Sequence, residues 1–135
     1  MNVRIKNILV CDDDSEIRDL VKDALQSYDR SFHIVEAVNG SDALAKCEFQ
    51  RFDLIILDMR MPRKTGMEVI EALEKMPTKK KPRAVLVVSG NSDFKALENR
   101  DTQYLYFPKP FSTKELITAV IALTQPPASS GDAAA

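Results

Sequence analysis

The sequence has little of what several common kinds of protein site require. Its 135 residues include no tryptophan, one histidine and two cysteines. No apolar run approaches the roughly 20 residues of a membrane-spanning helix, and no segment resembles a secretion signal, so we expect a cytoplasmic protein without a membrane partner. Neither common type of glycine-rich nucleotide loop is present, which argues against the nucleotide-binding motifs that depend on such loops.

The scarce reactive side chains fall inside expected regular structure. Cys11 lies in a strand-like run and Cys47 in a helical one, which favours buried thiols over a disulfide or a metal site. His33 lies in another strand-like run. We expect this histidine to be a surface or core residue, away from the carboxyl ends of the strands, and to have no phosphohistidine role.

The charge of the chain gives no drive toward nucleic acid. The formal net charge is −1. The one dense basic stretch, residues 79–81 with Lys75 and Arg83 nearby, has no adjacent aromatic residues on which bases could stack. We therefore expect this stretch to be a solvated loop, and we expect no direct nucleic-acid partner.

Short apolar runs alternate with helical patterns, which predicts βαβ units and a parallel sheet. Strands are expected near residues 7–11, 32–37, 54–58, 84–88 and 104–107, and helices near 16–27, 41–49, 67–75, 91–99 and 113–123. Ser112 with Glu115 matches a capping box at the start of the last helix. Right-handed crossovers then give an α/β three-layer sandwich. We expect residues 1–124 to form one domain and residues 125–135 to be a disordered tail, a linker stub or a remnant of cloning.

The first strand-like run ends in three consecutive aspartates. A helix cap explains Asp14, because Asp and Ser are preferred at that position and Ser15 could also serve. Capping explains Asp12 and Asp13 poorly, because adjacent like charges at a partly enclosed strand end repel each other. A divalent cation would relieve that repulsion. We therefore interpret Asp12 and Asp13 as a hard-oxygen site that suits Mg²⁺.

Three other strand-like runs end in groups that suit a phosphate. Asp58 closes a wholly apolar run, and a carboxylate beside a metal can accept a phosphoryl group. Ser89 offers a hydroxyl donor, although a polar turn is an equal alternative. Lys109 stands between two prolines, where a cis bond before Pro110 would aim it at the sheet edge. Because the carboxyl ends of parallel strands share one edge, we expect these groups to meet Asp12 and Asp13 there.

Taken in order, these motifs resemble those of response-regulator receiver domains in two-component phosphorelay signalling. The matching segments are residues 8–14, residues 57–62 with Gly66, residues 88–90 and residues 109–111. The resemblance extends from about residue 5 to residue 123. It implies a flavodoxin-like, doubly wound, five-stranded parallel sheet of order 2-1-3-4-5 with five helices.

The resemblance also implies a chemistry for the acidic residues. Asp58 would be the phosphoacceptor and Mg²⁺ the cofactor. The metal would be held by Asp13, by Asp12 largely through water, by Asp58 and by the backbone carbonyl of Arg60. Arg60, two residues after Asp58, departs from the family pattern, and its side chain together with Asn91 would alter water access and hence the lifetime of the phosphate.

Three further residues have roles that the resemblance implies. Ser89 would follow the phosphoryl group, Lys109 would bind it, and Tyr106 would switch between outward and inward positions. The surface made by the expected helix 91–99, the last strand and the last helix would then change its affinity for partners. Pro108 and a segment between Ser89 and Lys109 that is about two residues short depart from the family pattern.

The implied partners are a histidine kinase or phosphotransfer protein as donor, and a downstream effector protein or output domain. The chain would be a monomer or a phosphorylation-dependent dimer, and it would catalyse only its own phosphorylation and dephosphorylation. It could stand alone or be the receiver portion of a larger regulator or hybrid kinase.

Two other function classes stay open at this point. One is a Mg²⁺-dependent phosphatase with an Asp nucleophile, similar to the haloacid dehalogenase group, for which Asp12 and Asp14 have the required spacing. Its usual cap domain has little room in 135 residues. The other is a phosphorylation-independent interaction domain, against which the complete set of site residues argues.

Overall fold

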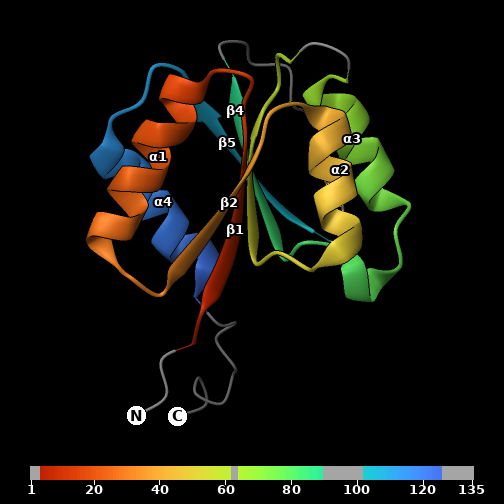
Figure 1. The fold of residues 1–135 in the computed structure, drawn as a ribbon, viewed down its shortest axis with the longest axis horizontal. Coiled ribbons are helices and arrows are strands. Elements are labelled where there is room, and N and C mark those ends of the chain that lie inside the picture. Colours follow the sequence, from red (N-terminus) through yellow and green to blue (C-terminus); the bar gives the residue numbers. More distant parts are fainter. Residues whose placement is uncertain (1–3, 62–63, 90–101, 126–135) are drawn as a thin grey trace.

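A five-stranded parallel sheet lies between two layers of helices in the computed structural model, which describes residues 4–61, 64–89 and 102–125 (Figure 1). The strands are β1 (Lys6–Cys11), β2 (Phe32–Ala37), β3 (Leu54–Asp58), β4 (Ala84–Ser89) and β5 (Gln103–Pro108). Their order across the sheet is β2-β1-β3-β4-β5. This confirms the predicted sheet and its three-layer architecture.

The helices cover the sheet in pairs. The helices α1 (Ser15–Tyr28) and α4 (Thr113–Thr124) pack on one face, whereas α2 (Gly40–Phe49) and α3 (Gly66–Glu74) pack on the other (Figure 1). A short 3-10 helix, η1 (Thr78–Lys80), precedes β4. The expected helix at residues 91–99 lies outside the described residues, so the label α4 belongs to the last helix. No helix in the described part of the chain is long and apolar enough to cross a membrane.

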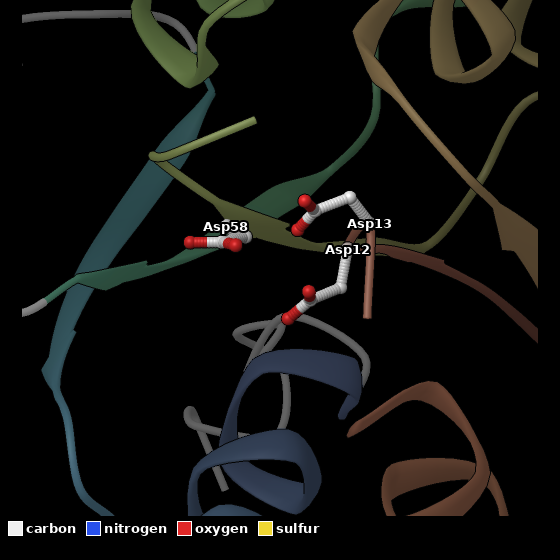
Figure 2. A group of neighbouring side chains, drawn as sticks. All are labelled: Asp12, Asp13 and Asp58. Atoms are coloured by element: carbon white, nitrogen blue, oxygen red, sulfur yellow. The ribbon is translucent and has the colours of Figure 1, made fainter. Parts of the chain in front are cut away.

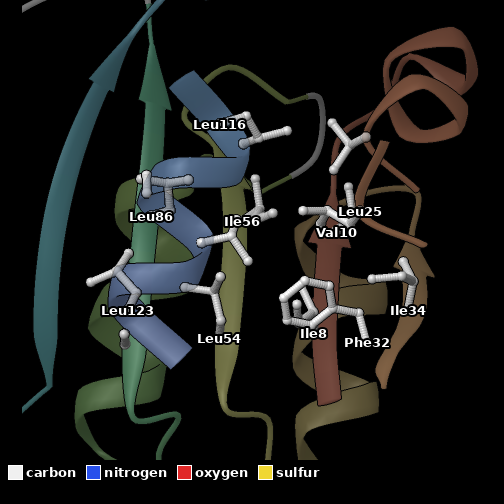
Figure 3. Close-up of a cluster of buried hydrophobic side chains, with 14 of the residues drawn as sticks. Ile8, Val10, Leu25, Phe32, Ile34, Leu54, Ile56, Leu86, Leu116 and Leu123 are labelled. Carbon is white, nitrogen blue, oxygen red and sulfur yellow. The ribbon is translucent and has the colours of Figure 1, made fainter. Parts of the chain in front are cut away.

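The apolar runs form strands because the sheet buries both of their faces. Every residue of β3 and β4 is buried, as expected for central strands between two helical layers. Alternate side chains enter two separate cores, since successive residues of a strand point to opposite faces. Leu54, Ile56 and Leu86 belong to the core beneath α1 and α4 (Figure 3), and Ile55 and Leu57 to the core beneath α2 and α3.

The register places the expected site residues along one edge of the sheet. Cys11, the residue before Asp12, pairs with Leu57, and Asp58 pairs with Val88. Ser89 pairs with Pro108, the residue before Lys109. The carboxyl ends of β1, β3, β4 and β5 therefore meet at the crevice where open α/β sheets bind ligands.

Side-chain caps set the starts of the helices. Asp14 caps α1 by accepting a hydrogen bond from the Glu16 amide at 2.9 Å, as predicted. The predicted capping box at the start of α4 is also present, between Ser112 and Glu115. A second capping box, formed by Thr65 with Glu68, starts α3 one residue earlier than predicted.

Gly66 at the start of α3 packs directly on the segment that follows Asp58. A Cβ atom there would lie 2.7 Å from the Cα atom of Met59, closer than real contacts allow. The Gly66 amide donates to the Met59 carbonyl at 3.2 Å. A residue without a side chain is therefore required where α3 crosses the end of β3.

The fold also places the two cysteines, the histidine and the basic stretch. Cys11 and Cys47 are free and buried, and burial raises the pKa of each thiol to about 12. His33 is exposed on β2. The prediction of a solvated loop is wrong for Lys81. This residue is only 8% exposed, and its ammonium lies 3.6 Å from the carboxylate of Glu74.

Candidate functional site

Three carboxylates converge at the carboxyl edge of the sheet. Asp12 and Asp13 follow β1, and Asp58 ends β3; one ligand oxygen from each lies within 4.8 Å of the others. Figure 2 shows the three side chains turned toward one space. Asp12 and Asp58 are each 5% exposed, while Asp13 is exposed. The predicted meeting of these residues is therefore present in the fold.

The environment of Asp12 disfavours its charged form. The pKa of Asp12 is raised from its ordinary value of 3.8 to about 6, chiefly by burial, and the charges of Asp58 and Asp13 contribute in the same direction. The Asp14 amide, which donates to Asp12 Oδ1 at 2.9 Å, and the Lys109 ammonium act in the opposite direction. The three converging carboxylates outnumber the Lys109 ammonium, and such a cluster of oxygen donors fits a hard divalent cation such as Mg²⁺.

Two hydrogen-bond donors contact the carboxylate of Asp58. The Lys109 ammonium lies 3.3 Å from Asp58 Oδ1, and the Arg60 backbone amide donates to the same oxygen at 3.1 Å. Lys109 follows β5 and reaches past β4 to the end of β3. The peptide bond between Lys109 and Pro110 is cis, as the sequence suggested. Asp58 is thus a buried carboxylate that lies close to both a cation and two further acids.

Ser89 and Tyr106 are connected to this centre through the backbone of Lys109. Ser89 ends β4 and is 4% exposed, and its carbonyl accepts a hydrogen bond from the Lys109 amide at 2.9 Å. The Tyr106 hydroxyl donates to the same carbonyl at 3.5 Å. Ser89, Lys109 and Tyr106 are therefore already in contact through one backbone oxygen. Asn91 lies outside the described residues.

An open cavity of about 460 Å³ gives access to the acidic cluster. Its lining consists of four acidic residues, two basic residues and four apolar residues. These are Asp12, Asp13, Asp14 and Asp58; Arg60 and Lys109; and Ile17, Leu20, Pro110 and Phe111. Arg60 is placed at this cavity, as expected from its position two residues after Asp58.

One contact to the cluster has no counterpart in the sequence predictions. Arg18 on α1 donates through Nη1 to the Asp12 carbonyl at 2.7 Å and through Nε to Glu36 Oε1 at 3.0 Å. The sequence signal was a cation one helical turn after Asp14. Which backbone group it reaches depends on the turn between β1 and α1, and the sequence pattern does not give that geometry.

Comparison with known proteins gives the family. The sequence model of the response regulator receiver domain family matches residues 8–121. The chain is 31% identical over 119 residues to the transcriptional regulatory protein CpxR of Escherichia coli (strain K12), and 36% identical over 117 residues to the transcriptional regulatory protein ResD of Bacillus subtilis (strain 168). The alignments cover 88% and 86% of this chain but 49% and 47% of the relatives. The chain thus spans about half the length of the curated relatives it matches.

Solved structures agree with that assignment. The response regulator TrrA from Thermotoga maritima, determined in complex with Mg²⁺-BeF, has a TM-score of 0.72 and 34% identity over 87% of this chain and 98% of its own. The chemotaxis response regulator CheY4 of Vibrio cholerae has a TM-score of 0.75 and 28% identity over 88% of this chain and 98% of its own. By motif order, fold and family match, the chain belongs to the response regulator receiver domains of two-component systems.

Proposed function

We propose that this domain accepts a phosphoryl group on Asp58 and changes its partner affinity as a result. The observation that carries the proposal is the placement of Asp58, buried between two further carboxylates and the ammonium of Lys109. The donor is the phosphohistidine of a histidine kinase or phosphotransfer protein. The domain catalyses its own phosphorylation and dephosphorylation and turns over no separate substrate.

The transfer step needs little covalent chemistry from the protein. A carboxylate oxygen of Asp58 attacks the phosphorus in line, a new O–P bond forms, and the N–P bond of the phosphohistidine breaks. The imidazole nitrogen keeps the electron pair of that bond and leaves as neutral imidazole after taking up a proton. Because such a transition state carries its charge on the phosphoryl oxygens, catalysis consists mainly of positioning and charge neutralisation.

The residues around Asp58 divide that task between them. The Lys109 ammonium neutralises phosphoryl oxygens, and the Ser89 hydroxyl donates to them. Asp12, Asp13, Asp58 and the backbone carbonyl of Arg60 would hold Mg²⁺. When bound, the metal would supply positive charge beyond that of Lys109, whose one ammonium does not balance three converging carboxylates.

The apolar rim of the cavity suits a protein donor. Ile17 and Leu20 on α1 line the cavity together with Phe111, and Leu20 is 48% exposed. An imidazole delivered by another protein can enter between these side chains while its surface packs against them. The cavity thereby provides both access to Asp58 and a surface for docking.

Phosphorylation would be read out through β5 and α4. An aspartyl-phosphate adds charge and hydrogen-bond acceptors, toward which Ser89 and Lys109 would move, and Tyr106 would fill the space that Ser89 vacates. The effect is a shift between two populations, limited by the difference in partner affinity between them. The partner that responds to phosphorylation is an effector protein or an output domain. The matched relatives CpxR and ResD, which are transcriptional regulatory proteins, are about twice as long as the matched segment. The domain acts as a monomer or as a phosphorylation-dependent dimer.

The phosphatase alternative has less support. It requires Asp12 and Asp14 to act together on one substrate. The carboxylate of Asp14 instead caps α1, where it accepts a hydrogen bond from the Glu16 amide. Its side chain is not among the three carboxylates that converge. We therefore expect no turnover of small phosphoesters.

The experiment that tests the proposal is labelling of Asp58 by a small phosphodonor. Acetyl phosphate with Mg²⁺ is expected to add one phosphoryl group to the wild-type protein, as read by intact mass, and none to Asp58→Asn. Asp14→Asn is the matched control, because asparagine caps a helix as well as aspartate does, and it should be labelled normally. Undiminished labelling of Asp58→Asn would defeat the assignment.

A further inference from the structure

Arg18 is tied to the peptide that joins the two metal-site aspartates. Its Nη1 donates at 2.7 Å to the carbonyl of Asp12, and that carbonyl belongs to the peptide linking Asp12 to Asp13. Its Nε donates at 3.0 Å to Glu36 Oε1 on β2. The Arg18 side chain is only 12% exposed. The guanidinium is therefore held at both ends in a nearly enclosed position.

The other hydrogen bonds of Asp12 do not hold its carbonyl, which is the group that Arg18 binds. The Asp12 amide donates to the Ala37 carbonyl at 3.2 Å, which fixes the chain before the Asp12 side chain. The Asp14 amide donates to Asp12 Oδ1 at 2.9 Å, which fixes the carboxylate of Asp12. The bond from Arg18 constrains the carbonyl between these two points, and rotation of that peptide would turn the Asp13 side chain relative to Asp58.

We propose that Arg18, oriented by Glu36, is a positioning residue for the metal site. It holds the peptide between Asp12 and Asp13 so that both carboxylates face Asp58. This inference rests on the proposed function, because it concerns the Mg²⁺ that the three acids would hold. A planar guanidinium suits the role, since its fork of donors can bind a carbonyl and a carboxylate at the same time.

The charge of Arg18 and its positioning role have opposite effects on metal affinity. Arg18 brings a positive charge close to the acids, so its charge alone disfavours a second cation there. If charge were its only influence, removal of Arg18 would strengthen Mg²⁺ binding. If Arg18 orients the ligands, its removal weakens binding, in the way that loss of a partner behind a metal ligand typically costs about tenfold or more. The sign of the change separates the two roles.

Lys22 provides a matched control on the same helix. Its ammonium lies 3.7 Å from Glu36 Oε2, so it shares the partner and the charge of Arg18. It is more exposed, at 39% against 12% for the Arg18 side chain. Replacement of Lys22 by methionine therefore removes one cation beside Glu36 while the Arg18 bond to Asp12 stays in place.

The test is titration of the unphosphorylated full chain with Mg²⁺, followed by calorimetry and by backbone amide resonances. We expect Arg18→Met to weaken binding by about tenfold and Lys22→Met to leave it unchanged or slightly stronger. Arg18→Lys keeps the charge without the fork, and it should also weaken binding. Before metal is added, the Asp13 amide resonance should move in Arg18→Met and stay in Lys22→Met.

Binding by Arg18→Met that is as tight as wild type, or tighter, would overturn the inference. Failure of the wild-type protein to bind Mg²⁺ would instead count against the proposed function. If Arg18→Met does not fold, as judged by thermal unfolding without metal, Glu36→Gln decides the question. That variant keeps the shape of Glu36 but weakens its hold on Arg18, so it should lower Mg²⁺ affinity, and unchanged affinity would reject the role.

Discussion

The side-chain nitrogen of Lys109 lies 3.3 Å from Oδ1 of Asp58, although 51 residues separate them in the chain. The contact joins the end of β5 to the end of β3 past the intervening strand β4. It gives the buried Asp58 carboxylate a positive neighbour in addition to its acidic neighbours Asp12 and Asp13. The arrangement is available before any phosphoryl group arrives, and such preorganised charge is what phosphoryl transfer requires.

Removal of the Lys109 charge should slow phosphorylation of Asp58. We expect Lys109→Met to lower the rate of labelling by acetyl phosphate by about 100-fold, the usual loss when one preorganised charge is removed from a reacting centre. Lys114→Met on the exposed start of α4 removes the same charge away from the site and should keep the wild-type rate. Time courses of intact mass measure both variants. Equal rates for Lys109→Met and wild type would show that the ammonium has no part in the transfer.

Asp13 and Asp14 should separate metal binding from helix capping. Asp13→Ala removes one of the three converging carboxylates and is expected to weaken Mg²⁺ binding at least tenfold. Asp14→Ala removes the cap of α1 and should lower the free energy of unfolding by about 1 kcal/mol with Mg²⁺ affinity nearly unchanged. Calorimetric titration and urea unfolding measure the two effects. The assignment fails if the two variants lose metal affinity equally.

Asp12 should make the metal-free protein less stable as the pH rises. Its pKa is raised from 3.8 to about 6, chiefly by burial, so the folded state binds this proton more tightly than the unfolded state. The contribution of Asp12 to stability is therefore most favourable below pH 3.8 and declines as the pH rises through about 6. The full difference between the two pKa values corresponds to about 3 kcal/mol.

Asp12→Asn removes this titration. Without Mg²⁺, the variant is expected to be more stable than wild type near neutral pH, and the difference should shrink toward acid pH. Urea unfolding in the presence of a chelator, at one pH on each side of the transition, measures the difference directly. Addition of Mg²⁺ should stabilise wild type more than the variant. A difference in stability that does not change with pH would contradict the raised pKa.

Arg60 should affect how long the phosphate lasts. Its backbone amide donates to Asp58 Oδ1, and Arg60 is among the residues that line the cavity at that carboxylate. Arg60→Ala keeps the amide and opens the cavity to water, so the aspartyl-phosphate is expected to decay several-fold faster. Arg60→Lys, which keeps a charge and much of the bulk, should decay at a rate nearer to wild type. Decay of the labelled protein after removal of the donor measures both rates, and an unaltered rate in Arg60→Ala would dismiss the idea.

Much of the fold was predictable because it depends on local patterns. The apolar runs that became β3 and β4 are buried throughout, and their spacing with helical segments predicted a parallel sheet. The caps at Asp14 and Ser112 were visible from residue types alone. The start of α3 was missed by one residue because it depends on the Thr65 capping box and on the packing of Gly66 against Met59.

The basic stretch illustrates what a local pattern does not reveal. As a run of lysines it predicted a solvated loop. In the fold, the Lys81 ammonium is buried beside Glu74, whose carboxylate also accepts a hydrogen bond from the Tyr104 hydroxyl at 2.6 Å. These partners come from α3 and β5, so only the tertiary structure brings them to Lys81.

Residue types along the chain indicate where the strands end, and therefore which chemical groups stand at the carboxyl edge of the sheet. Periodicity and strand-end chemistry are properties of neighbouring residues, so they can be recognised without the fold. The way in which the groups contact one another depends on the fold: the 3.3 Å distance between Lys109 and Asp58, and the hydrogen bonds from Arg18 to Asp12 and Glu36. Those distances depend on strand register, on turn geometry and on side-chain direction, which are fixed only when both cores close around the sheet.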